Sequence, residues 1–192
     1  MVRALLDGRK TMTRRIIKPQ PRPLRNAGPF YRPHPVTSPR DWLCLLGDSQ
    51  HCWTRVLYAV GDRLWVREAI SAGGWNPPIY RVDEEAQFGG AARENNIWSP
   101  SIHMPRWASR LTLTVTEVKV ERLQDISEDD AEAEGAYECE NGWSYGGSPL
   151  AGSTARGAFY CLWNSIHGPG AWDTNPWVAA IRFTVAKGNI DA

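Results

Sequence analysis

This sequence of 192 residues lacks the features that mark membrane-bound and secreted proteins. No apolar run approaches the length of about eighteen residues that a helix needs to cross a membrane. Charged side chains at Arg3 and Asp7 come too early to leave room for the apolar core of a signal peptide. We therefore expect a cytoplasmic protein with no membrane partner.

Cysteine is scarce, and its spacing does not fit a metal site. The four cysteines include no C-x-x-C pair, and Cys44, His51 and Cys52 do not follow a common zinc-binding pattern. Free thiols are the usual state of such cysteines in the cytoplasm. The sequence therefore predicts neither a metal ion nor another cofactor.

Acidic side chains are nearly absent from the first forty residues, where Asp7 stands against eight arginines and two lysines. Residues 121–192 have the opposite bias, so the net charge of the whole chain is only +1. Lysine is also rare, because 18 of the 22 basic residues are arginine, which forks onto phosphates and stacks on bases. This basic segment indicates either an anionic partner such as nucleic acid or a solvated arm that neutralises the acidic end.

Apolar residues make up 42% of the chain, enough for one hydrophobic core in a single domain over residues 1–192. Apolar periodicity and capping residues predict three short helices. Alternating apolar residues predict three strands. The expected helices cover 2–7, 127–135 and 158–166, and the expected strands cover 61–68, 110–122 and 177–186.

The strand expected over 110–122 changes its apolar phase near Thr116 and Glu117, which predicts a bulge or a sharp bend there. Few helices, three or four strands and long connections rich in Pro and Gly favour an α+β fold around a small mixed β-barrel. The strands are too few and too irregular for a Rossmann sheet.

The densest polar chemistry lies between Gly8 and Arg15, where a helix end meets a strand. Such a loop can hold a phosphate through backbone amides and arginine forks. It can also build a nucleophile, because Lys10 and Thr13 are three residues apart and can converge in a turn. A threonine hydroxyl needs a base beside it, and lysine is a base only when neutral, a state that burial and neighbouring arginines favour.

The pattern Gly8-x-Lys10-x-x-x-x-Arg15 resembles the signature of the ASCH superfamily, which consists of small PUA-like β-barrels linked to RNA. Its Gly-Arg-Lys-Thr-x-Thr stretch, ending at Thr13, is similar to that of the superfamily's N4-acetylcytidine amidohydrolases. Residues 61–68 resemble the second strand of the family. Residues 123–135 resemble the segment after its central strand, and their Ala-Glu-x-Glu run ends at Glu134. The whole pattern also resembles ASCH-like proteins of phages and prophages.

The resemblance implies one PUA-like (ASCH) β-barrel with flanking short helices and long loop insertions. The insertions have no counterpart in the compact amidohydrolases. The skeleton covers about 1–17, 58–70, 106–136 and 158–187, and the insertions cover 18–57, 70–105 and 137–157.

The resemblance also implies amide hydrolysis on a modified nucleobase, as a nucleoside or in RNA. Neutral Lys10 would take the proton of Thr13, whose oxygen attacks the acetyl carbonyl. Glu134 would pass a proton to the leaving amine or orient water. The structural alternative for Glu134 is a solvated acid near a helix end. In this reading the catalytic residues are Lys10, Thr13 and Glu134.

Seven further residues are candidates for binding nucleic acid or a base. Three of them come from the basic loop, and the others were expected to line a pocket opposite Lys10. The structural alternative for Glu68 is an ion pair with an arginine of the basic loop, and that for Trp107 is a plug of the barrel. The seven residues are Arg9, Arg14, Arg15, Glu68, His103, Arg106 and Trp107.

Two other functions remain open at this point. The same pocket and basic rim would serve a non-catalytic module that binds RNA or a modified base. A ribonuclease is a third alternative, but it needs a histidine or an acid–base pair near the phosphate, and none of the four histidines stands in such a context.

Overall fold

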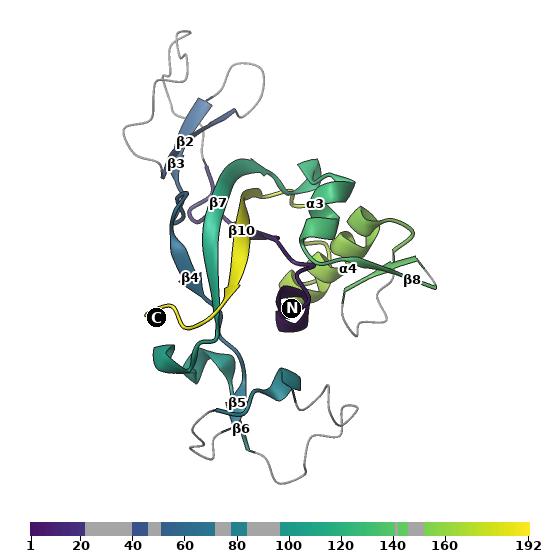
Figure 1. The fold of residues 1–192 in the computed structure, drawn as a ribbon. Coiled ribbons are helices and arrows are strands. Elements are labelled where there is room, and N and C mark those ends of the chain that lie inside the picture. The colour runs from purple at the N-terminus through teal and green to yellow at the C-terminus, as the bar shows by residue number, and fades with distance from the viewer. Residues whose placement is uncertain (22–39, 46–50, 72–77, 84–96, 141, 146–151) are drawn as a thin grey trace.

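The computed structural model describes residues 1–21, 40–45, 51–71, 78–83, 97–140, 142–145 and 152–192. Its centre is a four-stranded antiparallel sheet in the order β1-β10-β7-β4 (Figure 1). The α+β class is therefore confirmed. Within the described residues the sheet is open, with β1 and β4 at its edges. The four strands are β1 (Met12–Ile16), β10 (Trp177–Lys187), β7 (Leu111–Arg122) and β4 (Arg63–Trp65).

The two long strands, β7 and β10, pair along their whole length, and their register shifts once. Arg182 pairs with Glu117 while its neighbour Phe183 pairs with Val115, so Thr116 is the extra residue of a bulge. The change of apolar phase in the sequence predicted this bulge, and the prediction is confirmed. The strand expected over 61–68 is shorter than predicted, because only Arg63–Trp65 pair with β7.

Helices lie next to the sheet, with α3 and α4 packed on one face and Leu5 of α1 packed in the apolar cluster on the other (Figure 1). Thr154 caps α4 by accepting a hydrogen bond from the Gly157 amide, and Ser127 caps α3 in the same way from the Asp130 amide. All three helices predicted from the sequence are present with shifted ends. They are α1 (Val2–Leu6), α3 (Glu128–Ala133) and α4 (Ala155–His167), and the 3₁₀ turns are η1 (Ser101–His103), η2 (Arg106–Ala108) and η3 (Leu123–Asp125).

The segments expected to be loop insertions contain strands of their own, which corrects the sequence prediction. Each of these strands has two to five residues and one partner strand of the same length, and alternation over so few residues gives too weak a signal. Most of the proline-rich stretch 18–39 lies outside the described residues. The three pairs are β2 (Asp41–Leu45) with β3 (His51–Arg55), β5 (Ile70–Ser71) with β6 (Trp98–Ser99), and β8 (Tyr137–Cys139) with β9 (Gly142–Ser144).

The sheet separates two apolar clusters, which explains why β10 is apolar on both faces. Ile181 and Phe183 pack into one cluster with Leu111 of β7. Val178 packs into the other cluster, which contains Phe159 of α4. Period-two alternation places these residues on opposite faces, as expected for a strand covered on both sides.

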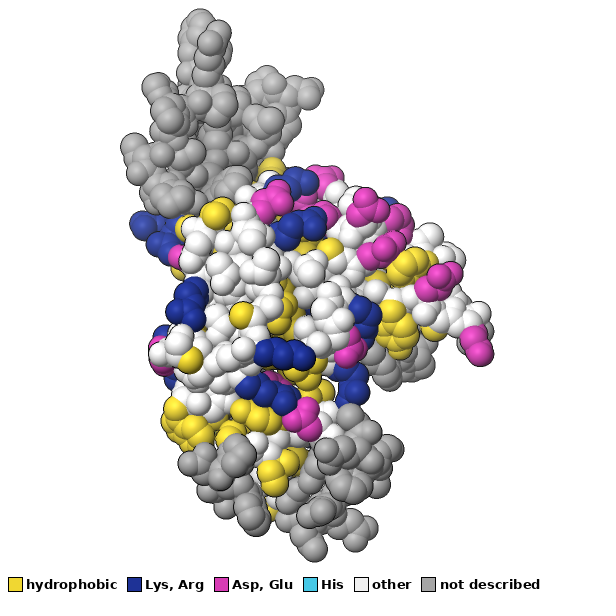
Figure 2. Space-filling model, in the orientation of Figure 1, with side chains coloured by type: hydrophobic (Ala, Val, Ile, Leu, Met, Phe, Trp, Pro, Cys, Tyr) yellow, Lys and Arg dark blue, Asp and Glu magenta, His cyan; other side chains and the backbone are white. Residues whose placement is uncertain are grey.

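The acidic end of the sequence forms an acidic surface around one helix. Acidic side chains gather over α3, whose first turn carries Glu128, Asp129 and Asp130 (Figure 2). Anions at a helix start are stabilised by its dipole. No helix among the described residues has the length and apolar character to cross a membrane.

Candidate functional site

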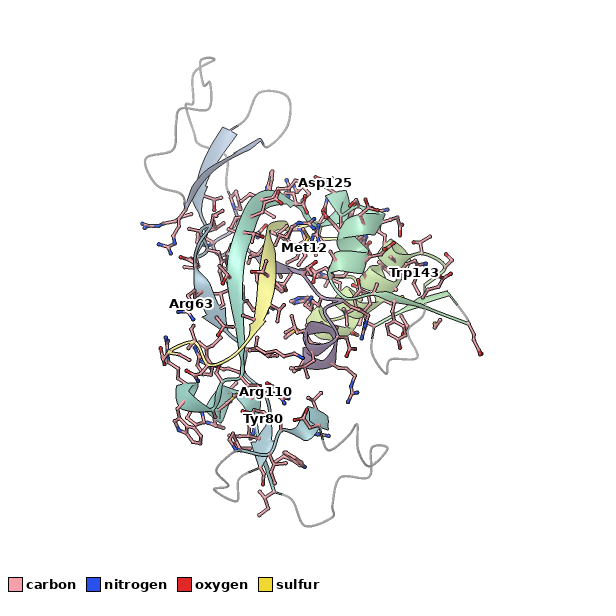
Figure 3. The ribbon with its side chains drawn as sticks, in the orientation of Figure 1. Met12, Arg63, Tyr80, Arg110, Asp125 and Trp143 are labelled. Atoms are coloured by element: carbon pink, nitrogen blue, oxygen red, sulfur yellow. The ribbon has the colours of Figure 1, made fainter. Side chains whose placement is uncertain are left out.

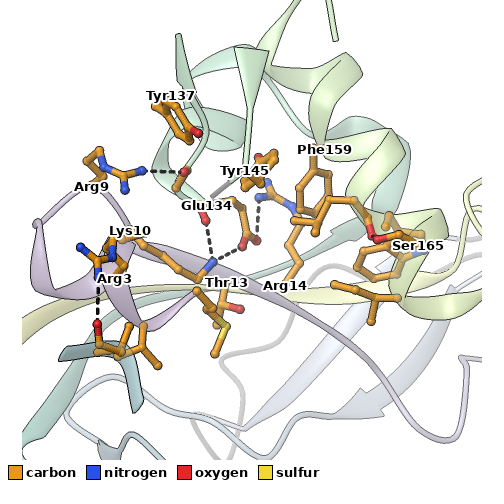
Figure 4. A pocket seen from close by; sticks show the side chains of 18 of the residues that line it. Arg3, Arg9, Lys10, Thr13, Arg14, Glu134, Tyr137, Tyr145, Phe159 and Ser165 are labelled. Atoms are coloured by element: carbon orange, nitrogen blue, oxygen red, sulfur yellow. Dashed lines mark hydrogen bonds and ion pairs between the residues drawn. The ribbon is translucent and has the colours of Figure 1, made fainter. Parts of the chain in front are cut away.

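A pocket of about 1220 Å³ opens between α1, β1, the end of α3 and one side of α4 (Figure 4). It contains the basic loop that the sequence singled out. Gly8, with φ of +73°, ends α1, and the chain then binds its surroundings through backbone hydrogen bonds. The Lys10 amide donates to the Ala4 carbonyl at 2.9 Å, and the Thr11 amide donates to the Ala133 carbonyl at 2.8 Å. The loop is thereby joined to both helices.

The structure brings Lys10 and Glu134 together, although they are 124 positions apart in the sequence. The Lys10 Nζ lies 2.6 Å from the Glu134 Oε2 and donates also to the Glu134 backbone carbonyl at 2.7 Å. Both residues are buried, with 6% and 5% of their surface exposed. The alternative of a solvated acid at the end of α3 is therefore wrong.

Arg14 adds a second cation to this cluster. Its guanidinium is fully buried and lies 2.7 Å from carboxylate oxygens of both Glu121 and Asp130. Its Nη1 is 3.5 Å from Glu134 Oε1. Because these carboxylates surround the guanidinium, Arg14 positions Glu134 instead of presenting a fork to solvent.

One oxygen of Glu134 has no hydrogen-bond donor. Oε1 is buried and accepts no hydrogen bond from a described residue, and the Arg14 Nη1 lies 3.5 Å from it. Oε2 is occupied by Lys10. A buried acceptor without a donor is costly, and such groups concentrate where a proton or a ligand is handled.

Thr13 lines the same pocket and lies below the end of the Lys10 side chain in Figure 4. It is a residue of the edge strand β1, and alternation directs its side chain away from that of Arg14. Its hydroxyl forms no hydrogen bond with any described residue, so it is available to a ligand. The three residues predicted to be catalytic, Lys10, Thr13 and Glu134, thus line one pocket.

Glu68 also lines the pocket and is buried. Its partner is Arg110, with Nε–Oε1 and Nη2–Oε2 distances of 3.0 and 2.8 Å, and not an arginine of the basic loop. The Arg110 guanidinium lies over the Tyr80 ring at 3.8 Å and binds Asp83 (Figure 3). Burial alone would lower the pKa of Arg110, but the hydrogen bonds that its guanidinium donates to Glu68 and Asp83 raise that pKa above its ordinary value.

The expectation that His103, Arg106 and Trp107 line the pocket is wrong. These residues belong to η1 and η2, and none of them contributes to the pocket. Arg106 instead binds Asp191 at 2.7 Å, and Trp107 is 61% exposed. That exposure also excludes Trp107 as a plug. These residues come just before β7 in the sequence, but that position does not reveal whether their side chains face the pocket.

Arg9 and Arg15 both lie at the pocket, as predicted, but in different environments. Arg9 donates to Asp7 at 2.9 Å and to the Gly135 carbonyl at 3.1 Å, and it lies 5.1 Å from the Tyr137 ring centre. Arg15 is exposed, and no ion pair joins it to a described residue.

The aromatic wall of the pocket was missed by sequence reasoning. Tyr145, Phe159, Trp163 and His167 line it from α4 and from the end of β9. Tyr145 donates to the Ala131 carbonyl at 2.7 Å, and burial, followed by the charge of Glu134, raises the pKa of Tyr145 well above its ordinary value. The spacing of the α4 aromatics indicated only a core-facing helix, because packed and pocket-lining rings have the same period.

Comparisons of the chain with protein-family models, curated proteins and solved structures find no match. The description of the site therefore rests on the fold and the pocket alone. The protein is a small α+β protein, and its pocket contains the buried Lys10–Glu134 pair and the Thr13 hydroxyl, which has no hydrogen-bond partner among the described residues.

Proposed function

We propose that this pocket hydrolyses the amide bond between an acyl group and the exocyclic amine of a modified nucleobase, such as N4-acetylcytosine in a nucleoside or in RNA. The observation that carries the proposal is the 2.6 Å contact of Lys10 with Glu134 in a pocket lined by Thr13. A hydroxyl nucleophile needs a base, and a base needs a place to send its proton. Thr13 supplies the hydroxyl, Lys10 supplies the base, and Glu134 accepts the proton that the base must lose.

In the proposed mechanism the Lys10 ammonium gives one proton to Glu134, and the resulting amine takes the proton of the Thr13 hydroxyl. The Thr13 Oγ1 then forms a bond to the acyl carbon, and the C–N bond breaks as Glu134 returns its proton to the leaving amine. Water attacks the acyl-threonine, releases the carboxylic acid and restores the hydroxyl. The net reaction is amide plus water to acid plus amine.

The arrangement around Glu134 suits this exchange. Its Oε2 already accepts a short hydrogen bond from the Lys10 ammonium, and its Oε1 has no donor among the described residues. Glu134 can therefore hold a proton on either oxygen without losing an existing partner other than Lys10. The pocket exceeds the usual range of about 300–1,000 Å³, which leaves room for a nucleotide or for one residue of an RNA strand.

The same proposal assigns the fold to the PUA-like ASCH domains. The support is the bulged antiparallel sheet flanked by short helices, together with the loop from Gly8 to Arg15 at its edge.

A second function, binding of a modified base without catalysis, is favoured by one observation. The Lys10 ammonium already makes two short hydrogen bonds, and both acceptors belong to Glu134. A pair closed in this way can serve as a rigid floor of a binding pocket.

The test is to incubate the protein with N4-acetylcytidine, free and within a short RNA, and to follow cytidine and acetate by chromatography. We expect turnover that Thr13→Val lowers by about three orders of magnitude and Lys10→Met by at least about a hundredfold. Thr11→Val is the matched control, because Thr11 is a threonine of the same loop that does not line the pocket. It should stay within about twofold of wild type.

Full activity in Thr13→Val would overturn the nucleophile. No turnover by the wild type, combined with saturable binding of the modified nucleoside that Lys10→Met abolishes, would establish the binding module in place of the hydrolase.

A further inference from the structure

Three basic side chains lie around the end of β1 and the last turn of α4. Arg15 and His167 both line the pocket, and Arg15, Lys18 and His167 are all exposed. Burial, and then the positive charges of Arg15 and Lys18, lower the pKa of His167. Arg15 and Lys18 are therefore close enough to His167 to disfavour its protonated form.

None of these three groups has an acidic partner among the described residues, unlike three other basic residues that line the pocket. Lys10 is bound to Glu134, Arg14 to three carboxylates and Arg9 to Asp7. The sequence adds no compensating charge nearby in the chain, because residues 8–40 contain no Asp or Glu. The positive potential at this end of the pocket is uncompensated, which favours an anionic ligand.

The position of this basic end relative to Thr13 is set by the strand. Thr13 and Arg15 are two residues apart on β1, so their side chains lie on the same face with a separation of about 7 Å along the strand. That separation is of the order that a ribose places between a base and its phosphate. Figure 4 shows α4, with Phe159 and Ser165, lining the pocket on the side of Arg14 away from Lys10.

The histidine is held by its neighbour on the helix. The rings of His167 and Trp163 have centroids 4.2 Å apart with an interplanar angle of 40°, and Trp163 is buried. A ring packed in this way presents its nitrogen atoms from a defined place, and a cation there also complements the negative end of the helix dipole.

We propose that Arg15, Lys18 and His167 form a subsite for a phosphate ester of the substrate, so that the pocket acts on nucleotides or on RNA in preference to free nucleosides. This deepens the proposed function and rests on it only for the place of the base. Arginine, as a planar fork, is the residue best suited to two phosphate oxygens. Lys18 supplies a second positive charge, and the His167 ring donates a hydrogen bond and gains a proton when a bound dianion raises its pKa.

The test measures binding by calorimetry, with cytidine, cytidine 5′-monophosphate and a short cytidine-containing RNA as ligands. We expect the monophosphate to bind about tenfold more tightly than cytidine, and Arg15→Gln to remove that difference without weakening cytidine. Lys187→Gln is the control, because Lys187 is an exposed cation of β10 that does not line the pocket. It should leave all three affinities unchanged.

Comparison of the ligands identifies the source of the phosphate. A preference for the monophosphate over the RNA indicates a terminal phosphate, whereas the reverse indicates the polynucleotide backbone. Equal affinities for cytidine and its monophosphate, or an equal loss of both in Arg15→Gln, would overturn the subsite. If the protein prefers the monophosphate but does not hydrolyse acetylated cytidine, the phosphate subsite is supported and the hydrolase is rejected. If it hydrolyses acetylated cytidine but has no preference for the monophosphate, the hydrolase is supported and the subsite is rejected.

His167 provides an independent readout, by a proton NMR titration of its ring. The groups that face it are Arg15 and Lys18, both positive, and the uncharged ring of Trp163. Inorganic phosphate bound among them should raise the pKa of His167, and Arg15→Gln should raise it without phosphate, because a repulsive charge is removed. An unchanged titration in saturating phosphate would contradict direct binding at this place.

Discussion

Lys10 and Glu134 are charged groups removed from water, and they are tolerated there only because they bind one another. Desolvation of a buried pair can exceed its Coulombic attraction, so such a pair is weak evidence of stabilisation and fits better with a functional requirement. Arg14 extends the cluster, since it has a carboxylate on each accessible side of its guanidinium. At the scale of the residue, the site keeps charge buried in a place where an apolar pair would fold equally well.

Removing one partner should therefore be far more harmful than removing both. We expect Glu134→Leu to lower the free energy of unfolding by about 3 kcal/mol, because it leaves the Lys10 ammonium buried without an anion. The double variant Lys10→Met/Glu134→Leu should recover most of that loss while remaining inactive. Denaturant unfolding measures the first effect, and the acetylcytidine assay measures the second.

An exposed ion pair provides the control for these stability measurements on the Lys10–Glu134 variants. Asp191→Ala breaks the pair with Arg106, both of whose side chains are more than half exposed, and should leave the unfolding curve unchanged. A stability loss in the double variant as large as that of Glu134→Leu would mean that the pair itself holds the fold together.

At the scale of the element, the connection after α3 sets the position of the lysine. Gly135 has φ of +104°, and a Cβ added to it would lie 3.2 Å from the Ala4 Cβ and 3.3 Å from the Lys10 Cβ. Gly61 has a similar φ of +89°, but a Cβ there would have no neighbour within 4 Å. Both positions require a backbone conformation that glycine adopts readily, and only Gly135 also requires the space.

This difference separates backbone strain from crowding. We expect both Gly61→Ala and Gly135→Ala to lose about 1–2 kcal/mol through strain. Gly135→Ala should lose more, and it alone should weaken ligand binding, because the added methyl pushes against Lys10. Thermal unfolding and calorimetric binding on the two variants provide the measurement, and equal behaviour of both would show that Lys10 does not depend on this turn.

The same scale shows which elements were predictable. The alternation of β7 extends over twelve residues, so its extent and its bulge at Thr116 could be read from the sequence. β8 and β9 have three residues each, too few for a periodic signal, so the sequence predicts a loop there. The prediction that Glu134 acts in the same site as Lys10 came from the resemblance to the ASCH superfamily and not from any periodicity of the sequence.

At the scale of the whole molecule, Arg110 joins the start of β7 to two separate parts of the chain. It binds the buried Glu68, which lines the pocket, and Asp83, and it covers the ring of Tyr80. Tyr80 in turn donates to the Ala108 carbonyl at 2.7 Å. Through these contacts the residues of the insertion that lie at the pocket, such as Val82, are fixed to the sheet.

Arg110→Met should therefore destabilise the protein by about 2–3 kcal/mol, because Glu68 remains buried without its cation. The midpoint of denaturant unfolding reports this loss. The control is Arg106→Met, which breaks only an exposed pair and should leave the midpoint unchanged. If Glu68→Gln restores the stability of Arg110→Met, the buried charge is the cause; if it does not, the packing of Arg110 on Tyr80 is the main contribution.

The sequence by itself determined the helices and strands whose apolar periodicity extends over many residues, and with them the α+β class. It also determined the place of the basic loop that carries Lys10 and Thr13. These features depend on residues that are neighbours in the chain. Only the tertiary structure decided that Arg14 is enclosed by carboxylates, that Glu68 binds Arg110, and that Trp107 lies away from the pocket. Such contacts join residues far apart in the chain, and alternation gives the face of a strand but not what packs against it. The basic end formed by Arg15, Lys18 and His167 likewise exists only because β1 ends beside α4.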